Sequence, residues 1–195
     1  MSPFRMQSRS LVAIGLLLTI TILTLGGWAL MLRLSGNVHA VVEGQIYRSA
    51  QLSPDHLRAL IREEGLRTII NLRGEQADAE WYRTEHATAD AAGLHYVSIP
   101  LSANEEPNEA TLQSLIDVMR SAEPPVLIHC EGGADRSGLA SALYRLMISG
   151  DEAGQAAGQL SFRYGHFPWL VSRSGAMDRA FWRVADAPER FKGAE

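Results

Sequence analysis

The chain has 195 residues, of which 46% are hydrophobic, and a formal net charge of −4. This length fits one globular domain with an additional segment, and the slight acidity gives no reason to expect nucleic acid as a partner. The single cysteine excludes an internal disulfide and any cysteine-rich zinc site, so we expect neither a metal nor another cofactor.

The amino-terminal part of the chain contains an apolar segment, residues 11–32, without a charged side chain. As a helix it would extend about 33 Å, which is enough to cross the hydrocarbon core of a bilayer. Arg5 and Arg9 precede this segment and only Arg33 follows it closely, so the positive-inside rule places residues 1–10 in the cytoplasm. We therefore predict a signal anchor, a single-pass membrane protein and a domain on the extracytoplasmic (periplasmic) side.

A cleaved secretory signal is the alternative interpretation of this segment, because Ala40 is a small residue of the kind that ends a cleavage site. The apolar run is longer than the core of a typical signal and ends well before Ala40, which favours the anchor. We expect residues 33–43 to be a linker, residues 44–186 to form the domain and residues 187–195 to be a loose tail.

Strand-like and helix-like segments alternate through the domain. The expected strands are residues 45–48, 68–72, 95–100 and 126–128, and the expected helices are residues 54–64, 75–92, 108–121, 138–149, 151–160 and 174–186. This alternation predicts an α/β fold with a central, mostly parallel sheet and helices on both faces. Ligands of such sheets bind at the carboxyl ends of the strands. Arg73 follows one strand end, so we expect it either near that site or in a structural salt bridge.

Residues 126–140, VLIHCEGGADRSGLA, place the cysteine in a turn between a buried strand and a helix. Gly132 and Gly133 are expected to adopt backbone angles closed to other residues, so that successive N–H groups point inward. The helix N-terminus adds further N–H groups, and Arg136 can bind two oxygens of a tetrahedral anion. The thiol of Cys130 would readily lose its proton there, which predicts nucleophilic attack on the phosphorus of a bound phosphate ester.

The pattern His129-Cys130-x5-Arg136-Ser137-Gly138 resembles the signature of the cysteine-based protein tyrosine phosphatase superfamily. The segments YRSAQ and TIINLR, at 47–51 and 68–73, are similar to those of its compact dual-specificity-like members in bacteria and fungi. The resemblance covers roughly residues 44–185 and implies a protein tyrosine phosphatase-like fold and a cysteinyl-phosphate intermediate. It implies a substrate-binding loop made of Glu131, Gly132, Gly133, Ala134, Asp135 and Arg136.

The resemblance also implies roles for the two residues that flank the loop. The hydroxyl of Ser137 would bond the sulfur and assist breakdown of the phosphoenzyme, and His129 would orient the loop and tune the thiol. Helix capping by Ser137 and a purely structural hydrogen bond of His129 are the alternatives.

The general acid is the part of the resemblance that this sequence does not match. The superfamily commonly uses an aspartate on the loop before the signature strand, but residues 101–107 contain Glu105 and Glu106 instead. Asp135 resembles the aspartate of Cys-x4-Asp-Arg loops in myotubularin-like and some bacterial phosphatases, which is assigned the acid role. We expect Asp135 to be the acid. The glutamates are the alternatives, and each can instead lie in a solvated turn before the next helix.

The charges of the loop bear on the substrate. Glu131 and Asp135 would repel additional phosphates, which favours phosphotyrosine or another lightly charged monoester over inositol polyphosphates. The expected partners are a phosphoprotein or a small phosphomonoester, together with the membrane. A catalytically weak phosphate-binding module, an inositol phosphate or phosphoinositide phosphatase and a rhodanese-like sulfurtransferase are the alternatives. The aromatic-rich residues 163–169 are expected to pack over the end of a core, or else to contact an aromatic phosphoester.

Overall fold

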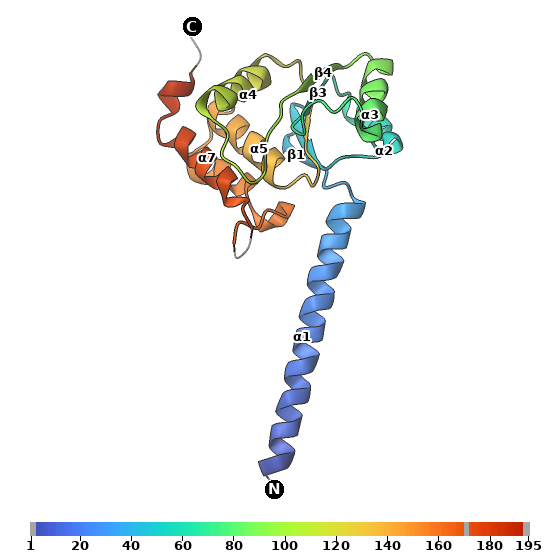
Figure 1. The fold of residues 1–195 in the computed structure, drawn as a ribbon, viewed down its shortest axis with the longest axis vertical. Helices are drawn as coiled ribbons and strands as arrows, with labels where there is room; N and C mark the ends of the chain where they lie inside the picture. The colour runs from blue at the N-terminus through green and yellow to red at the C-terminus, as the bar shows by residue number, and fades with distance from the viewer. Residues whose placement is uncertain (1–2, 170–171, 193–195) are drawn as a thin grey trace. The chain divides into compact units, whose positions relative to one another are not determined.

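The structure is a computed structural model, which describes residues 3–169 and 172–192, with side chains from Ile14 onward (Figure 1). The chain divides into two compact units, Met1–Ser35 and Gly36–Glu195. The first unit contains one described helix, and the second contains the sheet with its surrounding helices.

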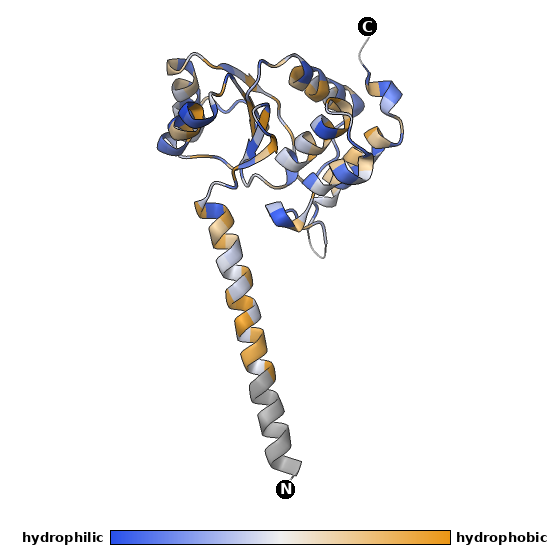
Figure 2. Cartoon of the chain, turned by 180° about the vertical axis from the view of Figure 1, so that it is seen from behind, coloured by the Kyte–Doolittle hydropathy of each residue, from blue (hydrophilic) through white to orange (hydrophobic). Residues whose placement is uncertain are grey.

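Helix α1 (Pro3–Leu34) is the described element of the first unit. Its stretch Ile14–Leu34 has 21 residues and a mean hydropathy of 2.0, so it is long and apolar enough to cross a membrane (Figure 2). The hydroxyls of Thr19, Thr21 and Thr24 each donate to a carbonyl oxygen four residues earlier, at 2.8–2.9 Å. These bonds satisfy the hydroxyl groups within the helix itself.

A five-stranded sheet forms the centre of the second unit, in the order β1-β2-β5-β3-β4. The strands are β1 (His39–Val42), β2 (Ile46–Ser49), β3 (Thr68–Asn71), β4 (His95–Ser98) and β5 (Val126–His129). The neighbours β2, β5, β3 and β4 are parallel, whereas the edge strand β1 is antiparallel to β2. The predicted α/β fold with a mostly parallel sheet is confirmed.

Helices cover both faces of this sheet (Figure 1). One group consists of α4 (Glu109–Ser121), α5 (Asp135–Met147) and α7 (Gly175–Ala185), and the other of α2 (Pro54–Glu64) and α3 (Glu80–Ala91). Adjacent strand residues alternate between the two cores: Ile70 and Ile128 belong to the cluster under the first group, and Ile69 and Leu127 to the cluster under the second. The short elements are α6 (Ala153–Ala156), η1 (Ala157–Gln159), η2 (Phe162–Tyr164) and η3 (Pro188–Phe191).

Two parts of the predicted domain boundaries are wrong. Residues 33–43 are not a linker, because His39–Val42 is a strand and Val41 is buried in the larger core. Within the expected tail, residues 187–195, Pro188–Phe191 forms a 3₁₀-helix and Phe191 packs into the same core, while residues 193–195 lie outside the described part. In both cases contacts with distant parts of the domain order a short segment, through pairing with β2 for His39–Val42 and through burial of Phe191 for Pro188–Phe191.

Two helices also differ from the expected ranges. The helix expected over residues 75–92 begins at Glu80, because a turn precedes it in which the N–H of Ala79 donates to the carbonyl of Gln76 at 2.8 Å. The helix expected over residues 151–160 is a single α-helical turn followed by a 3₁₀ turn, α6 and η1.

The carboxyl edge of the sheet carries a row of polar residues. Ser49, His129, Asn71 and Ser98 are the last residues of β2, β5, β3 and β4 and lie opposite one another in the strand register. Because β5 lies between β2 and β3, the segment after His129 emerges at the middle of this edge, where parallel sheets bind their ligands.

Candidate active site

The loop of residues 130–134, called the signature loop below, connects β5 to α5 at this edge. Cys130 is 2% exposed, and its Sγ lies 3.4 Å from the Oγ of Ser137 in the first turn of α5. Ser137 is itself buried, and α5 begins at Asp135 without a side-chain cap. The structure therefore places the Ser137 hydroxyl against the sulfur and not at the helix cap.

Arg48 on β2 binds the signature loop from the interior of the domain. Its fully buried side chain donates from Nη2 to the carbonyl oxygens of Gly133 and Ala134, both at 2.9 Å, and from Nη1 to two oxygens of Gln159 at 2.7 and 3.0 Å. Burial lowers the pKa of Arg48 to about 10, so it remains a cation at neutral pH. The C=O and N–H of a trans peptide point in opposite directions, so the N–H groups of Ala134 and Asp135 point away from Arg48.

Glycines at two positions allow this close packing. Gly133 has φ +69°, and a Cβ there would lie 2.5 Å from the backbone N of Ala50. A Cβ at Gly138 would lie 3.2 Å from Nη2 of Arg48, so this glycine makes room for the guanidinium. Gly132 differs, because it lacks a positive φ and a Cβ there would meet nothing within 4 Å. The expectation that both loop glycines need special backbone angles is wrong for Gly132.

Arg136 is the second residue of α5, and its side chain is 15% exposed. Its Nη1 donates to the carbonyl of Leu101 at 3.4 Å, and its buried Nε has no hydrogen-bond partner among the described residues. The carboxylate of Glu131, which is 73% exposed, lies 3.9 Å from Nη2. The guanidinium thus retains donors for an oxyanion, and Glu131 adds negative charge at the solvent side.

Asp135 is hydrogen-bonded to a histidine that no motif singled out. The Nδ1 of His166 lies 2.7 Å from Oδ1 of Asp135, and its Nε2 lies 2.9 Å from Oδ2 of Asp178 on α7. Burial alone would lower the pKa of His166, but the bonds to both carboxylates outweigh burial and raise it. The structure shows no group of three or more potential ligands that could hold a metal ion, within the part of the chain that it describes.

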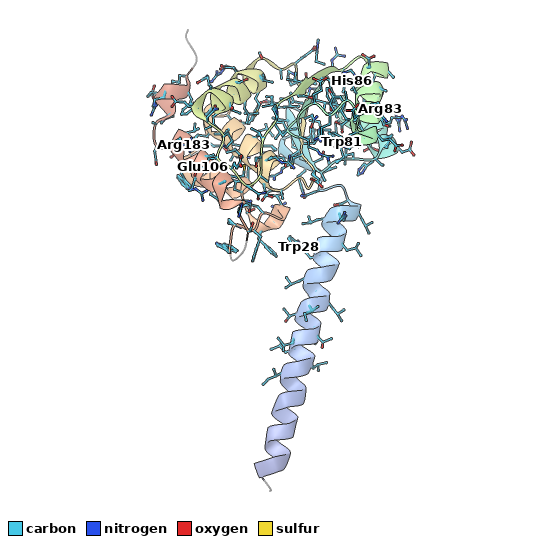
Figure 3. The ribbon with its side chains drawn as sticks, viewed as in Figure 1. Trp28, Trp81, Arg83, His86, Glu106 and Arg183 are labelled. Atoms are coloured by element: carbon cyan, nitrogen blue, oxygen red, sulfur yellow. The ribbon has the colours of Figure 1, made fainter. Side chains whose placement is uncertain are left out.

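The two glutamates expected as alternative acids lie in different surroundings. Glu106 forms ion pairs with Arg179 and Arg183 of α7, and the two labelled side chains Glu106 and Arg183 lie together in Figure 3. Glu105 is exposed. The structure thus places Ser137 against Cys130 and carries Asp135 and Arg136 on the first turn of the same helix, α5, whereas Glu106 joins the loop before α4 to α7.

His129 is part of a buried polar network beneath the signature loop. Its Nε2 lies 2.9 Å from Oε1 of Glu85 on α3, and both side chains are at most 5% exposed. Glu85 also accepts hydrogen bonds from the hydroxyl of Tyr96, at 2.6 Å, and from the side chain of Gln51. Burial alone would raise the pKa of Glu85, but the bonds from His129, Tyr96 and Gln51 outweigh it and lower the pKa.

Comparison with known proteins identifies the family. Residues 33–170 match the family described as "DSP-PTPase phosphatase fused to NAD+ Kinase" (PTP-NADK). The chain belongs to this family of cysteine-based phosphatases. Over 107 residues it is 29% identical to the dual specificity protein phosphatase TpbA of Pseudomonas aeruginosa, and the match covers 54% of this chain and 44% of TpbA. The phosphatase thus aligns with less than half the length of this curated relative.

Solved structures share the fold of this phosphatase. P. aeruginosa TpbA in complex with pTyr has a TM-score of 0.64 and 22% identity, over 80% of this chain and 89% of that one. The core catalytic domain of the PP-IP phosphatase SIW14 from S. cerevisiae, in complex with citrate, has a TM-score of 0.60 and 18% identity, over 80% and 94%. PTPMT1 in complex with PI(5)P has a TM-score of 0.58 and 15% identity, over 77% and 98%.

Arg73 forms no salt bridge among the described residues and is linked to the signature loop through Gln51. Its guanidinium stacks on the ring of Trp81, 3.6 Å from the centroid, and its Nη1 donates to Oε1 of Gln51 at 2.9 Å. The backbone N–H of Gln51 donates to the carbonyl of Glu131 at 3.1 Å. Arg73 is therefore one residue removed from the signature loop of the phosphatase, through Gln51.

Asn37 gives the signature loop a contact with the start of the domain. This buried side chain donates from Nδ2 to the carbonyl of Gly132 at 3.0 Å and to the carbonyl of Tyr164 at 2.8 Å. Sequence reasoning missed Asn37, Arg48, Glu85 and His166. Of these four residues, only Arg48 could have been selected from the sequence, since it lies in the segment 47–51 that resembles other phosphatases of this kind.

Proposed function

We propose that this phosphatase hydrolyses phosphate monoesters, with phosphotyrosine as the preferred substrate, through a cysteinyl-phosphate intermediate at Cys130. The observation that carries the proposal is the buried Sγ of Cys130, 3.4 Å from Oγ of Ser137, in a loop whose Gly133 and Ala134 carbonyls point inward to Arg48. The N–H groups on the opposite side of the loop and the Arg136 guanidinium supply hydrogen-bond donors for the phosphate oxygens.

The proposed reaction has two steps. The thiolate of Cys130 forms a bond to phosphorus while the ester P–O bond breaks, and the leaving oxygen receives a proton from the acid. Water then attacks phosphorus and gives a proton to the same carboxylate, the S–P bond breaks, and inorganic phosphate leaves. The Ser137 hydroxyl donates to the departing sulfur and stabilises it as a thiolate.

We assign the acid to Asp135, adjacent to Arg136 at the start of α5. Two guanidinium groups bind the carboxylate of Glu106, and Glu105 is exposed to solvent, so neither is arranged as a proton donor. Asp135 is partly exposed and has His166 on one oxygen, at 2.7 Å. The bond from His166 fixes the position of this carboxylate beside Arg136.

The substrate assignment rests on charge. Glu131 and Asp135 place two carboxylates on the loop, which opposes binding of substrates with several phosphates. The TpbA complex with pTyr agrees with a phosphotyrosine substrate. The relatives described as a PP-IP phosphatase and as a complex with PI(5)P make inositol phosphates and phosphoinositides the second class to test.

We further propose that α1 remains attached as a membrane anchor, with the phosphatase domain on the extracytoplasmic side. Arg5 and Arg9 before the apolar stretch support this orientation. Cleavage after Ala40 would remove Asn37, and with it the bonds to Gly132 and Tyr164, as well as half of β1. Retention of the segment is thus favoured by the needs of the folded domain.

The test uses the full chain in detergent with an aryl phosphate and a labelled phosphotyrosine peptide. We expect turnover by the wild type, phosphate on Cys130 after acid quenching, and peptide binding without turnover by Cys130→Ser. Binding of vanadate by a wild type that never turns over would identify a phosphate-binding module instead. Faster hydrolysis of inositol polyphosphates than of phosphotyrosine peptides would overturn the substrate assignment.

The acid is tested separately with pH–rate profiles. Activity that needs a protonated acid falls at high pH, and Asp135→Asn should abolish this limb of the profile. Glu106→Gln is the matched control and should keep the limb. A basic limb that survives in Asp135→Asn would refute the assignment.

A further inference from the structure

The aromatic segment after η1 splits into an inward and an outward set. Tyr164 is 7% exposed, whereas Phe162, Phe167 and Trp169 are 41%, 40% and 59% exposed. The outward rings contact one another, with centroids 6.2 Å apart for Phe162 and Phe167 and 5.1 Å apart for Phe167 and Trp169. The expectation that residues 163–169 pack over a core is met by Tyr164 and is wrong for Phe167 and Trp169. Phe162, Phe167 and Trp169 are called the aromatic cluster below.

Positive charge borders the aromatic cluster. Arg163 and Arg173 are exposed, and neither makes an ion pair with another described residue. Residues 172–174 lie against the cluster, since Ser174 Oγ donates to the carbonyl of Phe167 at 3.3 Å. Exposed tryptophan and phenylalanine beside arginine are the composition of surfaces that enter the headgroup region of membranes.

The aromatic segment is fastened to the point at which the chain enters the domain. Asn37 donates to the carbonyl of Tyr164 at 2.8 Å, and the rings of His39 and Tyr164 meet edge to face with centroids 4.9 Å apart. Leu34 is the last residue of α1. Three peptide units separate Leu34 from Asn37, a reach of at most about 11 Å.

We propose that Phe162, Phe167 and Trp169 are a membrane-contact surface that inserts into the headgroup region of the bilayer, with Arg163 and Arg173 facing anionic lipid headgroups. The inference rests on the proposed membrane anchoring by α1. Covalent reach keeps the segment near the membrane surface, and the exposed rings and cations match the chemistry of that surface. Insertion of the cluster fixes how the domain is oriented on the bilayer.

The experiment measures tryptophan quenching by lipid in the full chain. The protein is reconstituted into vesicles with one anionic phosphatidylglycerol in about four lipids, with or without bromine atoms at the headgroup end of the acyl chains. The emission of Trp169 is obtained by subtracting the fluorescence of the Trp169→Phe variant from that of the wild type. Trp182 on α7, 44% exposed, is the matched control and is isolated in the same way with Trp182→Phe.

We expect brominated lipid to reduce the emission of Trp169 about twofold or more and to leave that of Trp182 unchanged. Vesicle flotation is measured on the same samples. Protein that does not float with the vesicles overturns the anchoring proposal. Protein that floats while Trp169 is not quenched overturns only the membrane-contact surface.

A kinetic measurement separates the membrane from a substrate as the occupant of the cluster. Trp169→Phe and Phe167→Ser should leave the KM for a soluble phosphotyrosine peptide unchanged, because the cluster contacts lipid. A KM that rises about tenfold, the loss of roughly 1.4 kcal/mol of contact, would assign the aromatic cluster to substrate binding and overturn the inference.

Discussion

Replacing Arg48 with methionine should destabilise the domain and impair the signature loop. Methionine fills the same space without donating a hydrogen bond, so four buried acceptors on Gly133, Ala134 and Gln159 lose their donor. Each hydrogen bond to a charged group contributes about 1.5–3 kcal/mol, and the cost of burying the cation offsets part of the sum. The expected net loss is about 3–5 kcal/mol, the size found when one partner of a buried charged network is removed.

The assay is urea unfolding of the full chain in detergent micelles, followed by near-ultraviolet circular dichroism. Arg58→Met is the control, because Arg58 is half-exposed and pairs on the surface with Asp55 at 2.6 Å, a contact that contributes less than about 1 kcal/mol. Vanadate affinity of Arg48→Met should fall about 100-fold as the loop N–H groups lose their orientation. Equal stability losses for the two variants, or unchanged vanadate binding, would refute the role given to Arg48.

Three further predictions follow from the same geometry. Arg136→Lys should lower kcat on an aryl phosphate about 1,000-fold with unchanged stability. The reason is that a lysine ammonium cannot form the two parallel hydrogen bonds to phosphate oxygens that the planar guanidinium forms, and near-normal turnover would contradict this. Asn37→Ala should lower the free energy of unfolding in urea by about 1–3 kcal/mol, because the carbonyls of Gly132 and Tyr164 lose their donor. An unchanged free energy of unfolding would contradict this role of Asn37. His166, whose folded pKa is raised, contributes stability that is full below its ordinary pKa of 6.5 and is lost as pH rises through the folded value. The stability difference between wild type and His166→Asn should therefore be largest near about pH 6 and shrink toward pH 9, and a constant difference would refute the linkage.

The fold and the centre of the site were predictable because their signals are local. The buried strand, the turn and the helix around Cys130 are adjacent in the sequence, and their periodicity requires no partner to be recognised. The helix caps were predictable for the same reason, because each depends on neighbouring residues. Asn108 accepts a hydrogen bond from the N–H of Thr111 at 2.8 Å, and Gly65 ends α2 in the left-handed conformation.

The supports of the loop were not predictable because their partners are distant in the sequence. Arg48 binds carbonyls 85 and 86 residues later, and Asn37 binds carbonyls 95 and 127 residues later. A backbone carbonyl has no side-chain identity, so no residue pattern marks it as an acceptor. The edge strand β1 was missed for a related reason, since it is defined by its antiparallel pairing with β2.

The hydrogen bonds of Asn37 have a consequence for which substrates can be reached. The side chain that binds the Gly132 carbonyl is three residues beyond the end of α1, so a short stretch of chain ties the signature loop to that helix. With the proposed membrane anchor, we expect a phosphate on a juxtamembrane segment, or on a long flexible tail that folds back, to reach this loop. We expect the same phosphate on the far side of a tall, rigid ectodomain to stay out of reach, so the proposed anchor would restrict substrates by their distance from the bilayer.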